Sequence, residues 1–161
     1  MRLLRLALLS MLLVMGLATH SAQAATSGAH FMSSSGSVND AGALVVTFDE
    51  AGLGNANITY TLSAAATAVY ACINGGGNHP KATNKETVQG QVSTGGTFQA
   101  KNGRVQASLV TGPLSAGSFT CPSGQTLVLA SVSYSDITLT DTTNSVSTTI
   151  PDTSRTFIAL A

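Results

Sequence analysis

The sequence lacks tryptophan, and only 9% of its 161 residues are charged, with a formal net charge of zero. Nucleic-acid binding needs clustered cations that neutralise phosphates, so this composition argues against a nucleic-acid partner. No long apolar run follows the first 24 residues, so we expect no membrane span in the mature chain.

Motifs for catalysis, for a metal and for a cofactor are also missing. The chain has no G-x-S-x-G nucleophile elbow, no C-x-x-C pair and no EF-hand loop. Asp49 and Glu50 are adjacent, so on a strand they would face opposite ways, which argues against a hydrolytic carboxylate pair. We therefore expect no enzyme, cofactor or metal. Calcium is the alternative at four residues that ordinary turns also explain: Asp136, Asp141, Asn144 and Asp152.

The N-terminal 24 residues have the pattern of an export signal. Arg2 and Arg5 precede an apolar run from Leu6 to Ala18, and Ala22-Gln23-Ala24 matches a signal peptidase site. The run is shorter than the roughly 20 residues that span a bilayer, which favours cleavage over membrane anchoring. We predict a signal peptide over residues 1–24 and a mature protein that is secreted or held at the cell surface.

The only cysteines, Cys72 and Cys121, both follow this site. An even cysteine count in an exported chain predicts pairing, because the compartment is oxidising. A disulfide between them would close a loop of about 50 residues and stabilise the fold by roughly 4 kcal/mol. The alternative, a catalytic thiol assisted by His79, lacks a residue recognisably placed to orient the histidine.

Alternation of apolar and polar residues dominates the chain from residue 38 onward. Such alternation is typical of half-buried strands, and turn residues separate the alternating stretches at intervals of roughly 8 to 12 residues. The pattern predicts an all-β chain, a single antiparallel β-sandwich of about seven to nine strands over residues 38–161, either Ig-like or jelly-roll-like. Residues 25–37 are rich in serine and glycine and do not alternate, so we expect a flexible leader there.

Two long alternating stretches contain irregularities. The pattern from Ile58 to Ile73 exceeds an ordinary strand, so we expect a break between Ser63 and Ala66, with a helix capped by Ser63 as the alternative. Between residues 126 and 139 the apolar positions change from even to odd numbers. A change of parity within a strand predicts a bulge, here at Ser135-Asp136.

Asn102-Gly103 lies between two alternating runs and is a strong hairpin signal, because both residues tolerate the positive φ of a type I′ turn. Lys101 and Arg104 flank this turn. Because they would be neighbours of like charge, we expect both to point into water at a solvated sheet edge.

The most unusual stretch runs from Ala71 to Glu86, where three glycines follow a predicted strand and precede polar and basic residues. A phosphate-binding loop is excluded, because the spacing is wrong and Pro80 intervenes. We predict a polar binding loop anchored at Cys72, with a plain connecting loop as the alternative. The candidate contact residues are Asn74, Gly75, Gly76, Gly77, Asn78, His79, Lys81, Asn84 and Lys85.

The block Ala71–Lys85 (ACINGGGNHPKATNK), together with the later Cys121–Tyr134 (CPSGQTLVLASVSY), resembles a group of small exported bacterial proteins of unknown function. The resemblance covers residues 69–139. It implies secretion and a pairing of Cys72 with Cys121, and it implies no activity and no functional residues.

These observations predict a secreted, non-catalytic β-sandwich module that binds an extracellular polysaccharide or a cell-surface component, or that belongs to an extracellular matrix. Two alternatives remain. The first is a structural subunit that self-associates into a coat or fibre through exposed sheet edges, and the second is a secreted hydrolase.

Overall fold

The computed structural model describes residues 28–75 and 84–160, which contain eight strands and no helix. The all-β prediction is therefore confirmed. The strands are β1 (His30–Val38), β2 (Leu44–Ala51), β3 (Asn57–Asn74), β4 (Lys85–Gln99), β5 (Arg104–Thr111), β6 (Gln125–Asp141), β7 (Val146–Ile150) and β8 (Thr153–Thr156).

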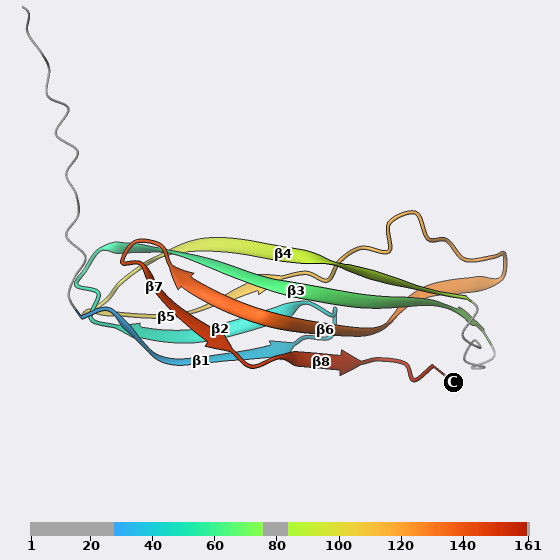
Figure 1. The fold of residues 1–161 in the computed structure, drawn as a ribbon, viewed down its shortest axis with the longest axis horizontal. Coiled ribbons are helices and arrows are strands. Elements are labelled where there is room, and N and C mark those ends of the chain that lie inside the picture. Colours follow the sequence, from blue (N-terminus) through green and yellow to red (C-terminus); the bar gives the residue numbers. More distant parts are fainter. Residues whose placement is uncertain (1–27, 76–83, 161) are drawn as a thin grey trace, which may run out of the picture.

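The strands form two antiparallel sheets that pack face to face (Figure 1). Sheet A has the order β1-β2-β5, and sheet B has the order β4-β3-β6-β7, with β8 also paired to β6. This is the strand order of an Ig-like sandwich in which the fourth strand lies beside the third. The predicted antiparallel sandwich is confirmed.

Sheet B is much longer than sheet A, because β3 has 18 residues and β6 has 17, whereas β2 and β5 have 8 each. The predicted break between Ser63 and Ala66 is wrong, and so is the helix alternative, since β3 continues without interruption. Its pairing with β6 shifts between Ser63 and Ala65, opposite a bulge in β6. The irregularity therefore lies in the partner strand.

That bulge lies where the change of parity predicts it. Asp136 has φ of +51°, and the buried side chains change from Tyr134 before it to Ile137 after it. The bulge lets β6 keep apolar residues in the core on both sides of one extra residue.

The core between the sheets is centred on four aromatic rings. The Phe48 and Tyr60 ring centroids lie 4.6 Å apart, and Phe31 and Phe98 lie 6.2 and 6.1 Å from Phe48. Offset and edge contacts of this kind add to the stabilisation from buried area. These rings join β1 and β2 of sheet A to β3 and β4 of sheet B.

The N-terminal strand contradicts one prediction. β1 pairs with β2 from His30 opposite Ala51 to Val38 opposite Leu44, so the predicted flexible leader is wrong for residues 30–37. The domain consequently begins before residue 38. A register shift between Phe31 and Ser33 interrupts the alternation that would have revealed this strand. Residues 1–27, with the predicted signal peptide, lie outside the described residues.

The Asn102-Gly103 turn is confirmed, but its hairpin is not. Asn102 and Gly103 have φ of +53° and +76°, and Lys101 and Arg104 exchange backbone hydrogen bonds of 2.9 and 3.1 Å. The strands on either side nevertheless separate at once, because β4 pairs with β3 and β5 pairs with β2. The turn therefore carries the chain from one sheet to the other.

The predicted disulfide is present. Cys72 near the end of β3 joins Cys121, with the Cα atoms 5.5 Å apart. It ties sheet B to the segment that leads from β5 to β6. None of the described segments forms a helix long and apolar enough to cross a bilayer.

Candidate binding surface

The described residues include only the two ends of the predicted glycine-rich loop. Asn74 and Gly75 are exposed at the end of β3, and Lys85 is exposed at the start of β4. Asn84 donates a 3.4 Å hydrogen bond from Nδ2 to Gln125 Oε1, and its carbonyl accepts from the Cys72 amide. Both ends are therefore held beside the disulfide. The other candidates, Gly76, Gly77, Asn78, His79 and Lys81, lie outside the described residues.

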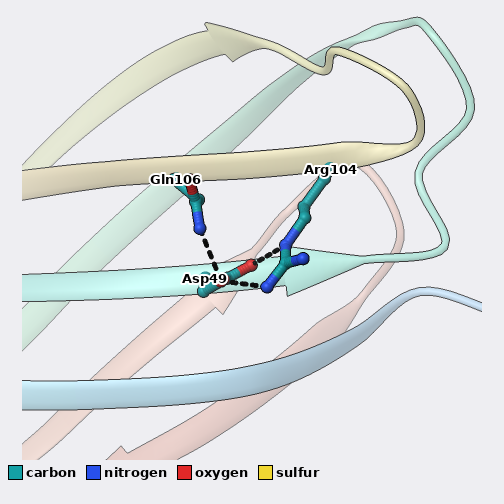
Figure 2. Close-up of polar contacts among 3 residues, drawn as sticks. All are labelled: Asp49, Arg104 and Gln106. Carbon is teal, nitrogen blue, oxygen red and sulfur yellow. Dashed lines mark hydrogen bonds and ion pairs between the residues drawn. The ribbon is translucent and has the colours of Figure 1, made fainter.

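A second group of polar side chains lies on the outer face of sheet A, and we call Asp49, Arg104 and Gln106 the Asp49 cluster (Figure 2). Asp49 on β2 is directly opposite Gln106 on β5 in the sheet, and Arg104 is the diagonal neighbour. Arg104 Nε and Nη2 donate to the two Asp49 carboxylate oxygens over 2.6 and 2.5 Å, and Gln106 Nε2 donates over 2.8 Å. Three donors thus orient a single carboxylate.

This arrangement lowers the pKa of Asp49 to about 2, first through the hydrogen bonds from Arg104 and then through the one from Gln106. The carboxylate also raises the pKa of the Arg104 guanidinium. Both groups therefore stay charged at neutral pH, and their charges cancel. Lys101 and Arg104 are both exposed, as predicted, but the Arg104 guanidinium also forms a bidentate pair with Asp49.

Two hollows adjoin the Asp49 cluster and share Gln106. The first, of about 550 Å³, is lined by Phe98, Gln99, Lys101, Arg104, Val105 and Gln106. The second, of about 340 Å³, lies over β1 and β2 and is lined by Ser33, Ser34, Ser35, Thr47, Phe48, Asp49, Gln106 and Ala107. The cluster therefore stands between a hollow lined by two basic side chains and one that is rich in hydroxyl groups, and one phenylalanine lines each hollow.

The Asp49 cluster offers directed hydrogen bonds with little net charge, and Lys101 adds one cation to the first hollow. Arg104 uses Nε and Nη2 for Asp49, which leaves its Nη1 group for another acceptor, and Gln106 uses only its amide nitrogen. Ser35 and Thr47 add a hydroxyl pair 2.8 Å apart. Half-buried Phe98 supplies apolar surface beside these groups, whereas Val105 is buried. Such a mixture suits a ligand that combines hydroxyl groups with exposed C–H surface.

Within the part of the chain that the structure describes, no hydroxyl or thiol is hydrogen-bonded to a histidine. His30 is the single histidine among residues 28–75 and 84–160, and its Nδ1 lies 2.6 Å from the Gly28 carbonyl oxygen. Within the same residues, no three His, Cys, Asp or Glu side chains are grouped closely enough to hold a metal ion. Of the four residues considered for calcium, Asp141 accepts the amides of Thr143 and Asn144 and so caps a turn.

Two further carboxyl groups lie inside the sandwich. Glu50 and Asp141 are both completely buried, and so is Tyr60. Among the described residues, three buried oxygens have no hydrogen-bond partner of normal geometry: the two Glu50 carboxyl oxygens and the Tyr60 hydroxyl. Burial, as the main cause, and the nearby Asp141 carboxyl raise the Glu50 pKa to about 7, although Tyr60 lowers it.

The sequence offered a signal for Glu50 but little for the Asp49 cluster. Glu50 continues the inward alternation of Leu44, Val46 and Phe48, so its parity alone places a carboxyl in the core. Asp49 and Arg104 are 55 residues apart, and their contact depends on the pairing of β2 with β5, which local patterns do not specify.

No family model, curated protein or solved structure matches this chain.

Proposed function

We propose that this protein is a secreted, non-catalytic binding module that holds an extracellular polysaccharide on the outer face of sheet A. The observation that carries the proposal is the Asp49 cluster, in which Arg104 and Gln106 fix one carboxylate at the boundary between two hollows. The disulfide between Cys72 and Cys121 is compatible with an extracellular location.

The chemistry of the surface supports a polysaccharide over a charged partner. The Asp49 and Arg104 charges neutralise each other, so the cluster offers donors and acceptors rather than a field that would attract ions. Sugar rings present hydroxyl groups at their edges and C–H groups on their faces. The hydroxyl groups would meet Arg104 and Gln106, and the C–H groups would meet the accessible part of the half-buried Phe98 ring.

Affinity electrophoresis in gels cast with individual cell-wall and extracellular polysaccharides tests the proposal. We expect at least one polymer to retard the wild-type protein, and Gln106→Ala to abolish most of that retardation. Gln91→Ala is the matched control, because Gln91 is also exposed on a strand but lies on β4, away from both hollows.

The outcomes separate this surface from the glycine-rich loop. If no polysaccharide retards the wild-type protein, the proposed function is wrong. If retardation survives Gln106→Ala but disappears when Asn78, His79 and Lys81 are changed to alanine together, the binding site belongs to the loop that the sequence predicts. Equal losses in Gln106→Ala and Gln91→Ala would contradict any specific site at the Asp49 cluster.

A further inference from the structure

The outer edge of β4 is the longest unpaired strand edge among the described residues. β4 has 15 residues and pairs only with β3, and no backbone hydrogen bond joins it to any other described segment. The backbone amides and carbonyls of an edge strand that point away from the sheet are free to pair with another strand.

Proteins usually protect such edges with charged residues, prolines or bulges. From Thr87 to Gln99, β4 contains neither a charged residue nor a proline. Its pairing with β3 runs from Asn57 opposite Gln99 to Ala71 opposite Lys85 without a register shift, so the strand has no bulge. This edge therefore lacks the usual obstacles to strand addition.

The other sheet edges are shorter or are covered. The opposite edge of sheet B is divided between β7, with 5 residues, and β8, with 4. In sheet A, β1 carries a bulge, and Arg155 of β8 donates from Nη1 to the Val38 carbonyl at the end of β1. β5 has only 8 residues. Among the described strands, β4 therefore offers the most backbone for pairing.

We propose that β4 pairs antiparallel with β4 of a second copy of this chain and joins two B sheets into one. Two identical strands that pair antiparallel are related by a two-fold axis, so the contact closes as a dimer and does not extend into a fibre. The side chains favour this partner. Exposed residues along β4, such as Gln89, Gln91 and Thr97, have amides and hydroxyls that both donate and accept, so they complement themselves.

Charge also favours a second copy over a charged strand from another protein. The uncharged stretch offers no counter-charge to such a strand, whereas two copies of it meet without like-charge repulsion. The processed chain, without residues 1–24, carries five basic and seven acidic residues, so its formal net charge of −2 gives only weak long-range repulsion between two copies. The proposed polysaccharide site is centred on β2 and β5 of sheet A, and it shares with β4 only Phe98 and Gln99, which line the first hollow.

Sedimentation velocity of the exported, processed protein over a wide concentration range tests the dimer. We expect a mass of two chains at high concentration. Gln91→Lys should weaken dimerisation about tenfold or more. Each copy would bring one lysine into the contact between the two β4 strands, where like charges repel each other. Thr149→Lys is the matched control, because Thr149 is also exposed but lies on β7 at the opposite edge of sheet B.

Amide hydrogen exchange gives a second measurement that does not depend on a variant. Amides between residues 87 and 99 should exchange more slowly as the protein concentration rises, while those of β7 should not change. A protein that stays monomeric at every concentration, with β4 exchange independent of concentration, overturns the proposal. So does a dimer that Gln91→Lys leaves intact or that Thr149→Lys disrupts equally.

Discussion

The Glu50 carboxyl on β2 and the Tyr60 hydroxyl on β3 meet in the core from opposite sheets, both completely buried and neither in a hydrogen bond of normal geometry. Unsatisfied polar groups in a core reduce stability, and a buried carboxylate is more costly than a buried carboxylic acid. Asp141 from β6 and His30 from β1 also act on Glu50, with opposite effects on its pKa. The ionisation of Glu50 therefore affects the stability of the whole sandwich.

We predict that the free energy of unfolding falls as the pH rises from about 4.5 to about 7. Glu50 has a pKa of about 7 in the folded protein and an ordinary value of 4.5 when unfolded, so the folded state binds more protons throughout this window. The total loss should be roughly 3 kcal/mol, since each pKa unit corresponds to about 1.4 kcal/mol. Urea denaturation at a series of pH values measures it.

The control for this prediction is Glu50→Gln, which keeps the side-chain shape but does not ionise. Its stability should change much less over the same window, and above pH 7 it should exceed that of the wild type. A wild-type stability that is constant or rises between pH 4.5 and 7 would contradict the assignment.

We predict that the Asp49 carboxyl titrates at a pKa of about 2 and moves back toward 3.8 in Arg104→Gln, because Arg104 supplies the largest stabilisation of the carboxylate. The stabilisation is present above pH 3.8 and is lost as the pH falls through 2. NMR titration of the side-chain carboxyl carbon measures the pKa. Arg155→Gln, at the other exposed arginine pair, should leave it unchanged.

We predict that replacing both cysteines by alanine lowers the free energy of unfolding by about 4 kcal/mol, because the disulfide closes a loop with a sequence separation of 49 residues in the unfolded chain. Chemical denaturation of the double variant and of the reduced wild-type protein should give similar values. A loss below about 1 kcal/mol in both would show that the covalent link adds little to this fold.

We predict that Gly42→Ala is more destabilising than Gly54→Ala. Both glycines have positive φ, so backbone strain should destabilise an alanine at either position by about 1 kcal/mol. A Cβ at Gly42 would also lie 2.4 Å from Leu129 Cδ2, whereas a Cβ at Gly54 would meet nothing within 4 Å. We expect thermal denaturation to give Gly42→Ala a free energy of unfolding roughly 1 to 3 kcal/mol lower than that of Gly54→Ala. Equal losses would mean that Leu129 moves aside freely.

The class of fold and the disulfide could be predicted from the sequence, because alternation and cysteine count are local or compositional signals. The bulge at Asp136 was predictable for the same reason, since a change in parity must be absorbed within one strand. The partner of each strand was not predictable in this way. The turn at Asn102-Gly103 has the residues of a hairpin, yet β4 and β5 pair with strands in different sheets.

The candidate surface shows the same limit. Arg104 follows a turn and was expected to be solvated, and only the register of β2 against β5 brings it to Asp49. The edge strand β1 escaped detection because its bulge interrupts the alternation and because serine dominates it. Sequence patterns thus identified strands with a regular buried face, but not the contacts between strands that build the surface.

The link between Cys72 and Cys121 also determines how the protein would respond to tension. β4 and β5 lie inside the covalent loop, whereas β1, β2, β6, β7 and β8 lie outside it. A force applied to the two ends of the chain would pass through the disulfide. It could not extend the segment between Cys72 and Cys121, whose sequence separation of 49 corresponds to roughly 160 Å of extended chain. Under load, the chain of β4 and β5 could therefore not be extended, whereas β2 could be pulled away and would take Asp49 from Arg104 and Gln106.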